Sequence, residues 1–158
     1  MVFAVKSSIK SDNSGLKEVL KACKEFKKPI KVGYLTNSEL AQKARTNHDG
    51  GIGVFEDGSK IEIPPRPFIV HAMDFFKDEI LNAGNSCLEN DFNVSAVKDK
   101  LDSVAKTARD AIKVSIEDVS SWSKYPYNSP RTVERKGFDH PLIETGAMKD
   151  GVEYSIGE

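Results

Sequence analysis

The sequence predicts an α+β domain with a mainly antiparallel sheet, helices packed on one face, and one long amphipathic helix. Three observations support this prediction: short alternating segments typical of strands, turn residues between them, and a long pattern of apolar residues at helical spacing. A chain of 158 residues has the length of one domain and can bury about 70% of its unfolded surface. We therefore expect a single domain over residues 1–158.

The first two expected elements are a helix at about residues 15–28 and a strand at residues 30–35. In the helix, apolar side chains recur at three- and four-residue steps, Ser14 can cap the start, and Pro29 ends it. In the segment IKVGYL that follows, apolar side chains stand at every second position, which is the period of a half-buried strand. The apolar stripe of the helix consists of Leu16, Val19, Leu20, Cys23 and Phe26.

A hairpin is expected next, after a loop or short helix at residues 38–51 that ends at paired glycines. Residues 52–55 and 61–63 have the composition of strands. They flank a turn at Asp57-Gly58, a residue pair that is common in tight hairpin turns. The two strands should therefore pair with each other.

The segment PPRPF, residues 64–68, is expected to turn the chain from the hairpin into a second helix. Proline cannot donate to a strand ladder, whereas Pro67 suits the first turn of a helix. Apolar residues at helical spacing continue to about residue 83, and Gly84 is expected to end this helix.

The longest expected element is a helix at residues 94–119, and its 26 residues give a length of about 39 Å. A stripe of this length suits packing across a sheet or a coiled coil, and the lack of matching heptads elsewhere favours the sheet. A closing strand is expected near Tyr154, because apolar and polar residues alternate there. The apolar positions of the long helix are 94, 97, 101, 104, 108, 112, 116 and 119.

Charge is distributed unevenly along the chain, although the net charge is −1. Residues 1–48 carry ten Lys and Arg against four Asp and Glu, whereas residues 49–102 carry five against eleven. This asymmetry suits a molecule that contacts copies of itself or another charged surface, and it also suits a hydrated surface without a partner. Lysines on one face of the first helix can contact DNA phosphates without sequence preference or face a neighbouring subunit. These lysines are Lys17, Lys21, Lys24 and Lys28.

No motif in the sequence indicates an active site, a metal site or a cofactor. The three histidines, at positions 48, 71 and 140, have no ligand spacing, and Cys23 and Cys87 fit no metal or redox motif. The glycines of HDGGIG lead into a strand rather than open a helix, so they do not predict a phosphate-binding loop. We expect no enzyme, no cofactor and no metal. No apolar run approaches the length of a membrane span, and we expect no membrane partner.

Residues 121–146 lie between the long helix and the closing strand and are polar and rich in turn residues. We expect them to form an extended arm. Thr132 can cap a short helix after the turn at residues 128–130, and Gly137 ends that helix. The cations Arg131, Arg135 and Lys136 would form a positive edge on this part of the arm.

The last part of the arm carries an apolar group at residues 141–143 that can anchor it to the core. Thr145 can cap another short helix that reaches Met148. An ordered arm of this kind suits contact with another protein, and an intramolecular lid is the alternative.

Two motifs, with a long helix between them, resemble the small neck and tail-completion proteins of tailed bacteriophages. That group includes minor tail components and, more distantly, the Mu-type virion morphogenesis proteins. The first motif is IPPRPF at residues 63–68, and the second is NSPRTVERKG followed by HPLIETG at residues 128–146. The resemblance extends from about Val32 to Ile156.

The resemblance implies a single tail-completion-like domain, not an enzyme, that forms a homo-oligomeric ring of six copies around the DNA channel where tail joins head. It implies tail terminator or tail-tube proteins and head-closure or connector proteins as partners, and nonspecific contact with packaged DNA. The protein would be made in the bacterial host cytoplasm and reside in the virion neck. The residues alone leave one alternative, a nonspecific nucleic-acid-binding module that uses the first helix. Candidate subunit or partner contacts are Arg66, Phe68, Asn128, Pro130, Arg131, Thr132, Arg135, Lys136, Pro141, Leu142 and Thr145.

Overall fold

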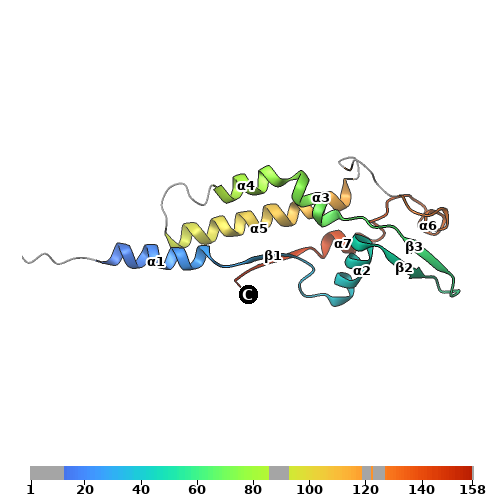
Figure 1. Ribbon diagram of the computed structural model, residues 1–158, viewed down its shortest axis with the longest axis horizontal. Helices are drawn as coiled ribbons and strands as arrows, with labels where there is room; N and C mark the ends of the chain where they lie inside the picture. The colour runs from blue at the N-terminus through green and yellow to red at the C-terminus, as the bar shows by residue number, and fades with distance from the viewer. Residues whose placement is uncertain (1–12, 86–92, 119–121, 123–126, 158) are drawn as a thin grey trace, which may run out of the picture.

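The computed structural model describes residues 13–85, 93–118, 122 and 127–157, and it has the α+β fold that the sequence predicts. Short strands lie between helices in the first part of the chain, and α3 to α7 follow one another before the last strand (Figure 1). In order, the elements are α1 (Ser14–Phe26), β1 (Ile30–Gly33), α2 (Ser38–Asp49), β2 (Gly51–Val54), β3 (Lys60–Ile63), α3 (Phe68–Phe75), α4 (Lys77–Asn85), α5 (Val94–Glu117), α6 (Pro130–Lys136), α7 (Ala147–Asp150) and β4 (Glu153–Ile156).

The long helix α5 is the centre of the molecule. It packs against α1, α3, α4 and α7, and against the strands β1 and β4, as the prediction of packing across a sheet requires. Of the predicted stripe, positions 94 and 104 are only partly buried and position 119 lies outside the described residues. The fully buried face combines small and branched side chains, namely Val97, Leu101, Ala105, Ala108, Ala111, Ile112, Ser115 and Ile116. The three alanines and Ser115 allow neighbouring elements to approach the helix closely.

The strands form two separate two-stranded sheets, whereas the sequence suggested one mainly antiparallel sheet. In the first sheet β1 pairs antiparallel with the closing strand β4, with Ile30 opposite Ile156 and Val32 opposite Tyr154. These four residues share one face of the sheet, and that face contacts α5. The pairing joins positions that are far apart in the sequence, so local patterns could not show which strand pairs with which.

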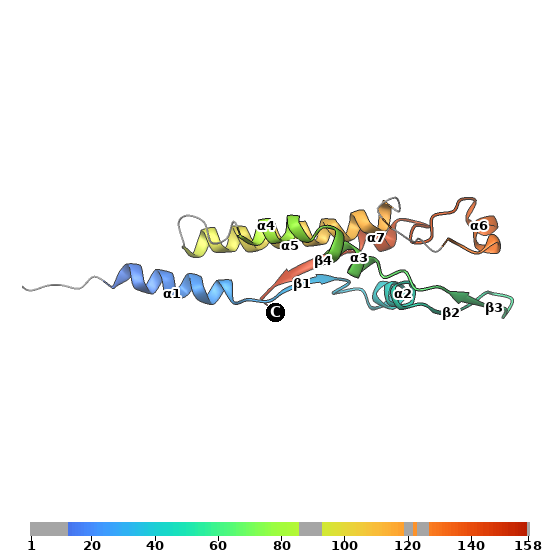
Figure 2. The ribbon, with the colours of Figure 1, turned by 45° about the horizontal axis from the view of Figure 1, so that its top comes forward.

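The second sheet is the predicted hairpin of β2 and β3. Its turn contains Gly58, whose φ of +80° lies in the left-handed region that favours glycine. The hairpin and α6 lie at one end of an elongated molecule, and α1 lies at the other (Figures 1 and 2). The two ends of the subunit therefore present different surfaces.

The helix predicted at residues 68–83 is two helices, α3 and α4, separated at Phe76. Phe76 has φ −100° and ψ 20°, away from regular helix, and its ring packs edge-on against that of Phe75 with centroids 5.1 Å apart. Both helices contact α5 on either side of this break. Gly84 lies inside α4 and does not end it. No Pro or Gly stands at the break, so the sequence carries no signal for it.

Helix ends agree with the predictions only approximately. Ser14 is the first residue of α1 and not its cap, because Asn13 occupies the cap position and its side chain accepts no bond there. The helix ends at Phe26, three residues before Pro29. The segment predicted as a loop or short helix is α2, which Asn37 caps by accepting from the backbone N–H of Leu40 at 3.0 Å.

The apolar stripe of α1 is largely exposed, although the helical pattern suggested a buried face. Leu16 is 60% exposed and Leu20 55% exposed, while Ala22 is the one fully buried residue of the helix. Figure 1 shows the cause: the first half of α1 projects beyond the beginning of α5, so only the second half is covered. Cys23, predicted as core, is partly buried, and Cys87 lies outside the described residues.

Candidate functional site

The arm contains a short helix, α6, whose start is fixed by Ser129 rather than by Thr132 as predicted. The Ser129 hydroxyl oxygen accepts from the backbone N–H of Thr132 at 3.3 Å, and Pro130 follows the cap at the first helical position, exposed to solvent. Proline suits that position because its missing N–H has no partner within the helix there. Gly137 ends α6 with a φ of +79°, as the sequence predicts.

Arg131 joins the arm to the turn of the hairpin. Its guanidinium donates to Asp57 Oδ2 at 2.6 Å and to Ser59 Oγ at 2.7 Å, and it lies 4.0 Å from the centre of the Phe55 ring. Asp57 also accepts from the hydroxyl and the backbone N–H of Ser59. These bonds from Ser59, and then the guanidinium of Arg131, hold the pKa of Asp57 well below its usual range. The arm is therefore fastened to its own hairpin.

The two other cations of the predicted positive edge are also engaged within the subunit. Arg135 pairs with Glu144 at 2.5 Å, which spans the loop after α6. The ammonium of Lys136 donates to the carbonyl of His140 at 2.6 Å and to the carbonyl of Ile143. Partial burial lowers the pKa of Lys136. The arm thus uses its cations to hold its own loop.

The predicted apolar anchor of the arm is confirmed. Leu142 is 3% exposed and belongs to the main core cluster, together with Ile112 and Ile116 of α5. Thr145 does not occupy the cap position of α7, which belongs to Gly146, although its hydroxyl oxygen accepts from Ala147 N–H at 3.4 Å.

Arg66 and Phe68 lie inside the corner between hairpin and α3. Arg66 is 4% exposed and donates through Nη2 to the carbonyl of Tyr127 at 3.2 Å, which ties the corner to the arm. Phe68 is fully buried, and His48 meets its ring edge-on with centroids 5.6 Å apart. Both side chains are buried and therefore act mainly by supporting the corner from within.

The structure brings Arg66 and most of the arm candidates together around one groove of about 1110 Å³, which we call the arm groove. It lies between α2, the hairpin, α6 and the loop that leads into α7. Phe68 and Pro130 are the two candidates outside its lining. Its apolar lining includes Leu40, Ile61, Ile63, Pro64, Leu142 and Met148.

The exposed charges of this groove that form no ion pair are negative. Glu56, Glu62 and Glu134 are exposed and form no ion pair within the described part of the chain. The exposed lining cations Arg131 and Arg135 are paired with carboxylates, and Lys43 pairs with Glu39 at 2.7 Å. The two remaining lining cations, Arg66 and Lys136, are buried or half-buried and donate to backbone carbonyls. The groove therefore combines apolar lining residues with three exposed carboxylates that have no ion-pair partner among the described residues.

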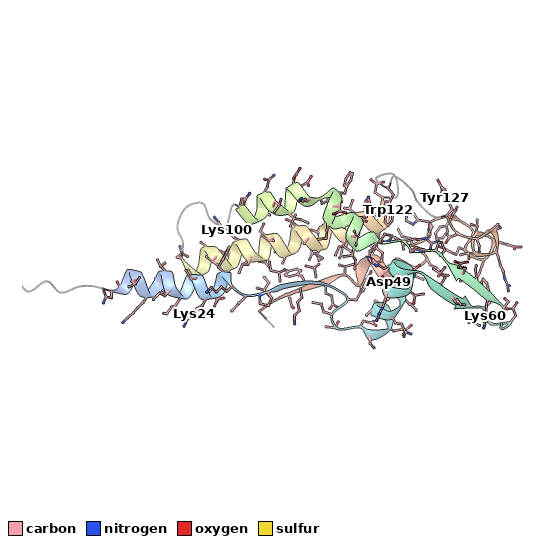
Figure 3. All side chains as sticks on the ribbon, in the orientation of Figure 1. Lys24, Asp49, Lys60, Lys100, Trp122 and Tyr127 are labelled. Carbon is pink, nitrogen blue, oxygen red and sulfur yellow. The ribbon has the colours of Figure 1, made fainter. Side chains whose placement is uncertain are left out.

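The opposite end of the molecule carries a surface that we call the α1 face, formed by Leu16, Val19, Leu20, Lys17, Lys21 and Lys24. Its apolar and basic side chains are exposed. The three lysines form no ion pair with any residue that the structure describes, whereas Lys28, beyond the helix, pairs with Glu25 at 2.7 Å. Figure 3 labels Lys24 at this end and Lys60 at the end that holds the groove.

The closest approach to a catalytic arrangement is a contact between His71 and Ser115, and it is structural. The Ser115 hydroxyl donates to the carbonyl of Phe68 at 2.9 Å, so its oxygen accepts from His71 Nδ1 at 2.9 Å. A base that activates a serine must instead accept the hydroxyl proton. His71 also stacks on Trp122, labelled in Figure 3, with ring centroids 4.5 Å apart. The network joins α3 to α5.

Among the described residues, no three His, Cys, Asp or Glu side chains gather closely enough to hold a metal ion. None of the described helices combines the length and the apolar character needed to cross a bilayer.

The chain matches no model of a known protein family, no curated protein and no solved structure.

Sequence reasoning identified the arm and the lysines but missed the groove and the exposure of the α1 face. The residues that form the groove come from four segments that are distant in the sequence. The one local signal was the alternation in β3, which places Ile61 and Ile63 on the same side of the hairpin.

The fastening of arm to hairpin should depend on pH through Asp57. Because its folded pKa is depressed, its stabilising contribution is present above the unfolded value near 3.9 and is lost as pH falls through the folded value. We expect Asp57→Asn to lower the Tm at pH 6, and the Tm of the variant to fall less than that of the wild type between pH 6 and pH 2. Circular dichroism melts at both pH values measure this. Equal falls in the two proteins would contradict it.

Proposed function

We propose that this protein is a structural subunit of the head–tail connection of a tailed bacteriophage. It acts as a tail-completion or neck protein and forms a ring of six copies around the DNA channel. The observation that carries the proposal is the presence of two different and complementary surfaces, the α1 face and the arm groove, at opposite ends of an elongated subunit. The resemblance of the two proline-containing motifs to neck proteins supports a location of this ring at the virion neck.

Two different surfaces on one subunit favour heterologous contacts, in which one surface of each copy binds the other surface of the next. Such contacts form a closed ring when the rotation between copies divides a full turn, and a filament when it does not. The exposed leucines of α1 support assembly, since an apolar patch rimmed by charge is typical of a protein interface.

In a ring at the neck, one side faces the tail terminator or tail-tube proteins and the other faces the head-closure or connector proteins. The protein would then reside in the virion after synthesis in the host cytoplasm. The arm and the corner at Arg66 are held in place because their side chains are buried or paired within the chain. This end of the subunit can therefore present an ordered surface to a partner.

The proposal is tested by deleting the gene from the source phage and viewing the lysate by negative-stain electron microscopy. We expect separate filled heads and finished tails, because the junction between them lacks a component, and a loss of infectious particles of several orders of magnitude. A plasmid copy of the wild-type gene should restore joined virions. Intact, infectious virions from the deletion phage would reject the role at the junction.

The exposed, unpaired lysines of α1 favour a second candidate function, nonspecific binding of nucleic acid. If three lysines contact phosphates, the affinity for random duplex DNA should fall steeply with salt, with a log–log slope of roughly −3. Replacing Lys17, Lys21 and Lys24 by Gln should remove most of this slope, whereas replacing Lys77, Lys98 and Lys113 should leave it. Fluorescence anisotropy measures the affinity between roughly 50 and 300 mM salt, a range over which the screening of exposed charges increases. Affinity that is independent of salt would exclude this function.

A further inference from the structure

The exposed apolar side chains of the α1 face have the spacing that suits docking of a helix in a groove. Leu16, Val19, Leu20 and Cys23 follow each other at steps of three, one and three, so they lie on one side of the helix. Amphipathic helices commonly bind by placing side chains at this spacing in an apolar groove. The first half of α1 projects past α5, and its side chains Leu16 and Leu20 are largely exposed among the described residues.

The arm groove has the complementary chemistry. Its lining offers Leu40, Ile61, Ile63 and Met148 to apolar side chains, and its exposed charges without an ion pair among the described residues are carboxylates. The exposed lysines of the α1 face are positive. Contact between the two surfaces would therefore bury apolar side chains and also bring opposite charges together. Asn128, also in the lining, has an Nδ2 that is buried without a hydrogen-bond partner among the described residues.

We infer that α1 of one copy docks in the arm groove of the next copy. The inference rests on the proposed ring and names the contact that closes it. A subunit cannot fill its own groove, because α1 and the groove lie at opposite ends of the molecule (Figure 1). Two α1 helices do not suit each other, because Lys17, Lys21 and Lys24 would face the same lysines of the second copy.

The outer surface of α3 and α4 is the competing receptor, since Val70, Phe75 and Leu81 are exposed there beside Asp74 and Asp78. Neither of two grooves of the described structure, the arm groove and a smaller one beside β2 and β3, is lined by residues of α3 or α4, whereas α2, the hairpin, α6 and the loop into α7 all contribute to the arm groove. The two receptors make different predictions when the charge of the arm groove is reversed.

The test uses two full-length variants with opposite changes. The first, Lys17→Glu with Lys21→Glu, makes the α1 face negative. The second, Glu56→Lys with Glu134→Lys, makes the arm groove positive. Each variant alone brings like charges together, and we expect its self-association to weaken by roughly tenfold or more. In an equal mixture every junction between unlike copies has opposite charges, so the mixture should assemble nearly as well as the wild type. A ring with an even number of copies can close in this alternating way.

Self-association is measured by sedimentation velocity over a range of concentrations, after circular dichroism has shown that each variant is folded. The matched control is Lys77→Glu with Lys113→Glu, which makes the same charge change outside both surfaces and should assemble as the wild type does. If the double groove variant does not fold, Glu134→Lys alone takes its place in the mixture.

Three results would overturn the inference. Normal assembly of the groove variant alone would place α1 on another surface, such as that of α3 and α4. A mixture that stays dissociated would show that the two surfaces do not meet. A wild-type chain that remains monomeric at every concentration would remove the contact between copies, but it would leave the role at the phage junction to the deletion experiment, which is read from virions and not from purified protein.

Discussion

Burial of one face of α5 is the interaction on which the rest of the structure depends. The helix runs from Val94 to Glu117, about 36 Å, and it packs against α1, α3, α4, α7 and the sheet of β1 and β4. Alanines on its face let these elements approach closely. Since each sheet has only two strands, and an isolated pair of strands is marginally stable in water, the strands depend on helices and loops packed beside them.

This dependence also determines what is left uncovered. Elements that extend past the ends of α5 obtain no further burial from it, and this applies to the first half of α1 at one end and to the hairpin and α6 at the other. At the second end, local ion pairs replace the missing core: Arg131 with Asp57 and Arg135 with Glu144. Those pairs engage two cations of the arm and leave exposed carboxylates such as Glu56 and Glu134, while Lys17, Lys21 and Lys24 at the first end have no acidic partner among the described residues. The asymmetry of charge along the sequence thus becomes an asymmetry between two ends of a subunit.

The sequence predicted the elements whose signals are local: the long helix, the strand at Ile30, the hairpin, the anchor at Leu142 and the end of α6 at Gly137. Predictions from the sequence were wrong or incomplete where contacts between distant elements determine the structure. The alternating pattern near Tyr154 cannot name β1 as its partner, and no residue type at Phe76 marks the break between α3 and α4. The stripe of α1 was a correct signal for a helix but carried no information on the length of the neighbour that covers it. The groove is assembled from distant segments, so its existence could be learned only from the structure.

Amide hydrogen exchange of α1, measured at low and high protein concentration by mass spectrometry, tests most directly whether the uncovered half of α1 is an interface. The account predicts that amides of residues 18–21 exchange rapidly in the dilute monomer and become protected as the protein assembles. Residues 23–26, already against α5, should change little. Unchanged exchange at residues 18–21 in a sample shown to be assembled would contradict the account, since the helix would then be as uncovered in the assembly as it is in the single chain.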